Sequence, residues 1–82
     1  MTNYKGELVA KAIERCLWLV NRTLREPVSA KVLCAEQGIA RRTLWRDVAR
    51  LRDAGHRFLS DHRGIQYSGF DASTAEAVRR AA

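Results

Sequence analysis

VSAKVLCAEQGIARRTLWRDVARLRD, residues 28–53, predicts two helices joined by a tight turn. The first helix is expected from Ser29 to Gln37, because the Ser29 hydroxyl can accept a hydrogen bond from an unpaired first-turn N–H. Gly38 predicts its end, since glycine adopts a positive φ at little steric cost. A helical pattern resumes at Arg41 and predicts a second helix over 41–53, with the single aliphatic residue Ile39 in the turn.

The second helix has an apolar back and a basic front. Leu44, Val48 and Leu51 are spaced i, i+4 and i+7, so they share one face. The other side carries Arg42, Arg46, Ala49 and Asp53, with Trp45 and Arg50 at its edges. Such a helix suits the major groove of DNA, whose walls are anionic and whose guanine edges accept bidentate hydrogen bonds from guanidinium groups.

The same run resembles the winged helix-turn-helix domain of bacterial repressors of the biotin-repressor and deoxyribose-repressor type. The matching positions are Leu33, Cys34, Gly38, Ile39, Arg41, Arg42, Thr43, Leu44, Arg46, Asp47, Val48 and Leu51. With the preceding helix and the hairpin, the resemblance covers Leu8 to Ser68. The chain departs from the family at Gln37, usually Leu, and at Ala40, usually Ser. Losing that Ser removes a helix N-cap worth about 1 kcal/mol.

The resemblance implies a mainly α fold with a small β-hairpin, a winged helix-turn-helix with a three-helix core plus wing. We expect this DNA-binding domain to span residues 1–70. Residues 71–82 are expected to form a tail or short helix, since Ser73-x-x-Glu76 has the spacing of a capping box.

Another helix is predicted before these two, from Glu7 to Arg25. It is expected to end before Glu26-Pro27, because proline cannot extend a helix. Its expected core-facing stripe consists of Val9, Ala12, Ile13, Cys16, Val20 and Leu24. This stripe would meet the core of the two later helices, Leu33, Ile39, Leu44, Val48 and Leu51. Trp18 projects towards the polar side, where it could cover the edge of the core or anchor a dimer.

The segment after the second helix predicts a β-hairpin. Ala54-Gly55 stops the helix, and Asp61-His62-Arg63-Gly64 has the composition of a turn between strands over 57–60 and 65–68. Ile65 and Tyr67 alternate onto one face. Phe58 and Leu59 are adjacent, so one of them faces away from the core, and the sequence leaves both choices open. Val28 could form a minimal strand that pairs with the hairpin.

Charge points to an anionic partner. The 82 residues suit one domain with a small core and hold 15 basic against 9 acidic residues, a net charge of +6. Between Arg41 and Arg63 lie seven arginines and three acids, so most of this charge sits on the basic helix and the hairpin. That location favours nucleic acid over a membrane surface.

Several other classes of protein are disfavoured. The sequence has no membrane-length apolar run and no signal-peptide pattern, so we expect a cytoplasmic protein. The family resemblance implies a bacterial or phage origin. Cys16 and Cys34 are expected to be small core residues, and without paired Cys-x-x-Cys spacing no metal site and no cofactor are predicted. No nucleophile–base constellation or phosphate-cradling glycine loop is present, so an enzyme is not expected.

The candidate site residues follow from the two expected DNA-facing elements. Arg42, Trp45 and Arg46 are expected to read bases. The expected phosphate contacts are Arg41, Thr43, Arg50, Arg52, Arg57, His62 and Arg63. Asp47 would be repelled by phosphate, and its position near the core rim predicts a structural ion pair instead.

These expectations describe a small, sequence-specific double-stranded-DNA-binding protein, a transcriptional regulator with residues 41–53 in the major groove. An excisionase-like architectural protein would use the same contacts. A winged-helix interaction module with an acidic protein partner would satisfy the same arginines. A homodimer is expected, because one such domain touches too few base pairs for strong specificity, although the sequence has no strong zipper-like seam.

Overall fold

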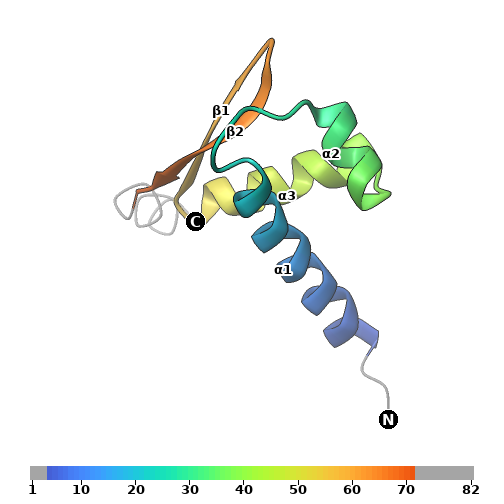
Figure 1. The fold of residues 1–82 in the computed structure, drawn as a ribbon. Coiled ribbons are helices and arrows are strands. Elements are labelled where there is room, and N and C mark those ends of the chain that lie inside the picture. The colour runs from blue at the N-terminus through green and yellow to red at the C-terminus, as the bar shows by residue number, and fades with distance from the viewer. Residues whose placement is uncertain (1–3, 72–82) are drawn as a thin grey trace.

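The fold consists of three helices followed by a two-stranded antiparallel hairpin. The computed structural model describes residues 4–71, with side chains from Ala10 onward, and the helix expected within 71–82 lies outside the described residues except for Asp71. The elements are α1 (Tyr4–Arg22), α2 (Ala30–Gln37), α3 (Arg41–Asp53), β1 (His56–Asp61) and β2 (Gly64–Phe70) (Figure 1). This order confirms the predicted mainly α architecture with a small wing.

The α2–turn–α3 unit forms as the sequence predicts. The Ser29 hydroxyl accepts a hydrogen bond from the Val32 amide at 3.2 Å, and Gly38 ends α2 with a left-handed φ of 63°. Helix α3 begins after Ala40, whose side chain makes no capping hydrogen bond. The N-cap that the resembled family supplies with serine is therefore missing here.

One hydrophobic core joins all five elements and the segment between α1 and α2. Its buried members are Leu19, Val28, Leu33, Leu44, Val48, Phe58 and Ile65. The expected core positions Leu33, Leu44 and Val48 are thus confirmed, while Ile39 and Leu51 pack against the core and stay half-buried. Trp18 also packs against it, as the edge-of-core interpretation predicted.

Helix α1 starts and ends three residues earlier than predicted. Proline at position 27 suggested an end at Arg25, but the helix ends at Arg22. The buried Thr23 explains the early end, because its hydroxyl donates to the Leu19 carbonyl at 2.8 Å and its own carbonyl accepts from the Tyr67 amide at 2.9 Å. The last turn of α1 is thereby tied to the hairpin instead of continuing.

The predicted core-facing stripe of α1 is only partly right. Val20 packs against the core, and Ala12 and Cys16 are half-buried, but the most buried side of the helix is a neighbouring one. The buried residues are Leu19 and Thr23, whereas Ile13 and Leu24 of the expected stripe are exposed. Leu19 fills the space beside Leu33 and Leu44 in the core. The apolar stripe therefore turns partly to solvent, and Val9 belongs to the positions whose side chains are not described.

The hairpin is longer than the expected strands 57–60 and 65–68. Its register decides which of the adjacent residues Phe58 and Leu59 faces the core. Phe58 pairs with Tyr67, and the register shifts between Arg57 and Phe58. Phe58 is consequently buried at 7% exposure, whereas Leu59 is 60% exposed. Val28 pairs with Ile65 through two backbone hydrogen bonds of 3.0 and 2.9 Å, which confirms the minimal third strand.

Candidate nucleic-acid interface

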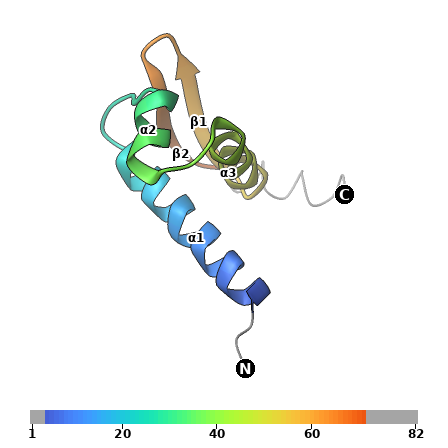
Figure 2. The ribbon, with the colours of Figure 1, turned by 90° about the vertical axis from the view of Figure 1, so that its right-hand side faces the viewer.

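The outward side of α3 is uncovered. In Figure 2, which looks nearly along α3, the hairpin and α2 lie to its left and α1 below it, and none of the other described elements lies to its right. Arg42 and Arg46 are exposed, and neither forms an ion pair or a side-chain hydrogen bond with the side chains that the structure describes, from Ala10 to Asp71. Two unneutralised guanidinium groups therefore stand one turn apart on a free helix face.

The start of α3 adds further polar groups to this face. Arg41 and Trp45 are exposed, and Thr43 is half-buried. Because the first N–H groups of an α-helix have no intrahelical acceptor, this end carries the positive pole of the helix dipole. Ala40 supplies no side-chain acceptor for these amides. The first turn is thus chemically suited to an incoming anionic oxygen.

Asp47 points inward and links α3 to α1. Its carboxylate is 2% exposed and accepts hydrogen bonds from Arg15 Nε at 2.8 Å and Arg15 Nη2 at 3.1 Å. Arg50 approaches the same carboxylate at 3.8 Å. The predicted structural ion pair is therefore confirmed. Sequence reasoning missed Arg15 as its partner, because the two residues are 32 positions apart and no local pattern connects them. The hydrogen bonds to Asp47 raise the pKa of Arg15 above its ordinary value.

Arg50 and Arg52 lie on the two flanks of α3 and not on its outward face. Arg50 lies on the α1 side, where it helps to line a groove. Arg52 lies on the hairpin side and donates to the Phe58 carbonyl at 3.3 Å. Both side chains remain exposed, so their free N–H groups are available at the edges of the basic face.

The turn of the wing is held by hydrogen bonds to the Asp61 carboxylate. The Asp61 carboxylate accepts a hydrogen bond from the Arg63 amide at 2.8 Å and another from Arg63 Nη2 at 2.9 Å. These bonds lower the pKa of Asp61 below its usual range and fix the arginine beside the turn. His62, at the tip, and Arg57, on β1, are exposed.

The structure thus sorts the predicted site residues into two groups. The exposed face and first turn of α3 bring together Arg41, Arg42, Thr43, Trp45 and Arg46. The hairpin carries Arg57, His62 and Arg63, with the turn at the far end of the wing from α3 (Figure 1). Among the described residues, no group of three or more His, Cys, Asp or Glu side chains is placed to hold a metal ion.

A three-helix core, a helix-turn-helix with an uncovered second helix and a β-hairpin behind it define a winged helix-turn-helix protein. A family model described as "HTH domain" matches residues 17–66, more than half of the chain. The chain belongs to this helix-turn-helix family. The family and fold are those of DNA-binding regulators and not of enzymes.

A solved structure shares this fold. The transcriptional regulator HlyU from Vibrio vulnificus CMCP6 superposes with a TM-score of 0.52 at 20% sequence identity, covering 94% of this chain and 83% of that one. A comparison with curated proteins finds no match. None of the described helices combines the length and apolar character that crossing a bilayer requires.

Proposed function

We propose that this protein is a sequence-specific regulator of transcription that places α3 in the major groove of double-stranded DNA. The observation that carries the proposal is the outward face of α3, on which Arg42 and Arg46 are exposed and have no partner among the described side chains of residues 10–71. A helix fits the groove, and the forked donors of arginine match guanine N7 and O6.

The remaining contacts are assigned by position. Trp45 packs against sugar or a thymine methyl beside the two base-reading arginines. The first turn of α3 binds one phosphate through Thr43, the free amides and Arg41. Phosphates on either side are contacted by the flanks of α3 and by the wing, through Arg50, Arg52, Arg57, His62 and Arg63.

The similarity of Arg41–Leu51 to the biotin-repressor and deoxyribose-repressor type supports a bacterial or phage regulator acting in the cytoplasm. A single domain of this size reads few base pairs. Two copies on one operator would double that number.

The proposal is tested by selecting bound duplexes from a random DNA pool and measuring affinity for the selected site. Arg46→Ala is expected to weaken binding by about 1–3 kcal/mol and to relax discrimination at one position, because it removes a base contact. Lys11→Ala is the matched control, since it removes one positive charge from the exposed side of α1.

The alternative outcomes separate clearly. Equal losses for Arg46→Ala and Lys11→Ala would show that charge alone drives binding and that α3 does not read bases. No enrichment of any duplex, together with binding to an acidic protein, would replace DNA by a protein partner.

A further inference from the structure

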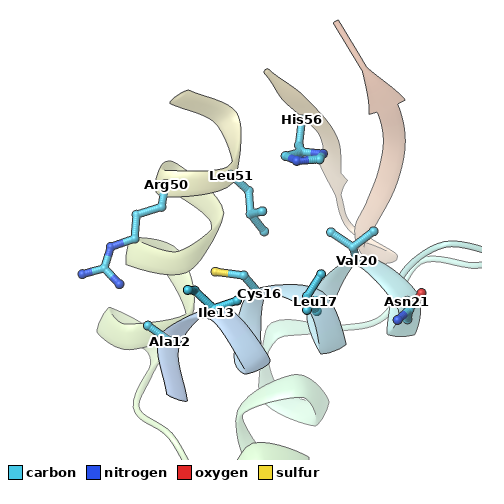
Figure 3. Close-up of a pocket in the computed structure, with 9 residues that line it drawn as sticks. All are labelled: Ala12, Ile13, Cys16, Leu17, Val20, Asn21, Arg50, Leu51 and His56. Carbon is cyan, nitrogen blue, oxygen red and sulfur yellow. The ribbon is translucent and has the colours of Figure 1, made fainter. Parts of the chain in front are cut away.

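An apolar ridge on α1 lies beside an apolar groove. Ile13 and Leu17 are spaced i, i+4, and their side chains are 55% and 62% exposed. The neighbouring groove runs between α1 and α3, encloses about 640 Å³, and is closed at one end by β1 (Figure 3). Its lining residues are Ala12, Ile13, Cys16, Leu17, Val20, Asn21, Arg50, Leu51 and His56.

The core uses only part of this face, where Val20 and Leu51 of the groove pack against it. Leu19 and Thr23 bury a different side of α1, so the stripe containing Ile13 and Leu17 is free. Of the residues proposed to contact DNA, this face includes only Arg50, and Leu51 lies on the side of α3 opposite Arg42. A contiguous apolar surface of this kind on a small soluble domain marks an interaction site.

We propose that this face joins two copies of the chain, with the Ile13–Leu17 ridge of each copy seated in the groove of the other. Ridges formed by i, i+4 side chains pack into the grooves of a second helix. An interface related by a two-fold axis must be self-complementary, and here one face carries both the ridge and the groove. A second copy therefore offers a ridge that can fill this groove and a groove that can accept this ridge.

Charge favours the same arrangement. Each copy carries a net charge of +6, so two copies repel one another over most of their surfaces. Arg50 is the only Asp, Glu, Lys or Arg among the groove residues, and it lies 3.8 Å from the Asp47 carboxylate. The groove face is thus where two basic chains can approach at low electrostatic cost.

Residues 72–82 of the same chain would fill the groove less well than a second copy. The described part of the chain ends at Asp71, whose amide donates to the Gly55 carbonyl next to His56 of the groove. The sequence of residues 72–82, ASTAEAVRRAA, contains Val78 as its only apolar side chain larger than alanine. One valine fills little of the groove, whereas the Ile13–Leu17 ridge supplies two large side chains to each of two grooves.

The size of the face predicts a weak dimer that DNA strengthens. A standard interface buries about 800 Å² on each partner, and one helix face with its flanking groove falls below that value. When two such domains bind adjacent half-sites, the binding of one copy raises the effective concentration of the other, so the overall affinity for DNA increases. The interface itself is measured without DNA, so its failure would leave the proposed DNA contact untouched.

Sedimentation of the full chain over a series of concentrations tests the interface. We expect a concentration-dependent dimer whose Kd rises more than about tenfold in Leu17→Glu, because the new charge would be buried against the groove. The matched control is Leu59→Glu, which changes an equally exposed leucine, 60% against 62%, on β1. Circular dichroism checks that both variants stay folded.

Two results would overturn the proposal. One is a wild-type chain that stays monomeric at millimolar concentration, and the other is a dimer that Leu17→Glu leaves intact. Binding of Leu17→Glu to a single half-site through Arg46 distinguishes loss of the dimer from loss of DNA recognition.

Cys16 provides a second readout inside the groove. In a Cys34→Ser background, we expect alkylation of Cys16 to slow as chain concentration rises, because the partner covers it. Burial raises the pKa of the Cys16 thiol, so the rates are compared at one fixed pH. If a chain ending at Asp71 instead reacts faster than the full chain at low concentration, residues 72–82 cover the groove and the proposal is wrong.

Discussion

Asp47 shows how one acidic residue can belong to a DNA-facing helix without opposing its function. It is buried at 2% exposure and held by two hydrogen bonds from Arg15, so its charge is neutralised on the inner side of α3. A bidentate arginine–carboxylate pair also restricts rotation of both side chains. The pair therefore sets the orientation of α3 relative to α1, which keeps Arg42 and Arg46 pointing outward.

Arg15→Ala is expected to lower the free energy of unfolding by about 3 kcal/mol, because it leaves a buried carboxylate with only Arg50 nearby at 3.8 Å. Urea denaturation followed by circular dichroism measures the change. Arg22→Ala is the control, since Arg22 also joins α1 to a carboxylate, that of Glu36, but on the surface. Exposed pairs contribute little to stability. Equal losses in the two variants would contradict the role assigned to burial.

At the scale of elements, the wing is attached to the helices by backbone contacts. Val28 pairs with Ile65, and the Tyr67 amide bonds to the Thr23 carbonyl at 2.9 Å. Gly64 makes this approach possible, because a Cβ at that position would overlap the Val28 carbonyl group. The position of the wing turn relative to α3 therefore depends on glycine at residue 64.

Gly64→Ala is expected to destabilise the fold by about 3 kcal/mol or more, combining backbone strain at φ 131° with this overlap. Gly69→Ala separates the two effects, since Gly69 has a φ of 111° and no atom within 4 Å of an added Cβ. It should cost about 1 kcal/mol from backbone strain alone. Thermal unfolding of both variants gives the comparison, and similar losses would mean that the contact with Val28 is unimportant.

Helix α1 has two apolar faces, of which one is buried and the other is exposed. One contributes Leu19 to the core, and the other carries Ile13 and Leu17 at the surface. The pattern of apolar residues alone placed Ile13 in the core-facing stripe and left Leu19 out of it. The ion pair between Arg15 and Asp47 accompanies the burial of the first face, because it places this face against α3.

At the scale of the whole molecule, charge and shape divide the surface into two working faces. The basic face consists of α3 and the wing, and the groove between α1 and α3 has a nearly neutral lining. Electrostatic attraction to DNA acts on the first face. Apolar burial can act on the second, and of the proposed DNA contacts only Arg50 belongs to both faces.

The proposed phosphate contacts predict a steep dependence of DNA affinity on salt. With about four to six phosphates neutralised, log K should fall against log salt with a slope of about −4 to −5. Arg57→Ala should reduce the slope by about one on every sequence, because a phosphate contact carries no base information. Fluorescence anisotropy at several salt concentrations measures this, and an unchanged slope would remove Arg57 from the interface.

The sequence by itself determined the local features of residues 28–53. The Ser29 cap, the Gly38 stop, the apolar back of α3 and the inward place of Asp47 depend on neighbours within a few positions. Helix caps and i, i+4 spacing act over that range, so they are visible in one sequence. The arginines of the candidate face could be chosen in the same way.

The tertiary structure alone decided which side of α1 is buried, which of Phe58 and Leu59 faces the core, and which arginine meets Asp47. Each of these choices depends on a partner far along the chain. Leu19 needs the core built by α2 and α3, Phe58 needs its register with Tyr67, and Arg15 lies 32 residues from Asp47. Packing among distant segments selects one of several arrangements that local patterns permit equally.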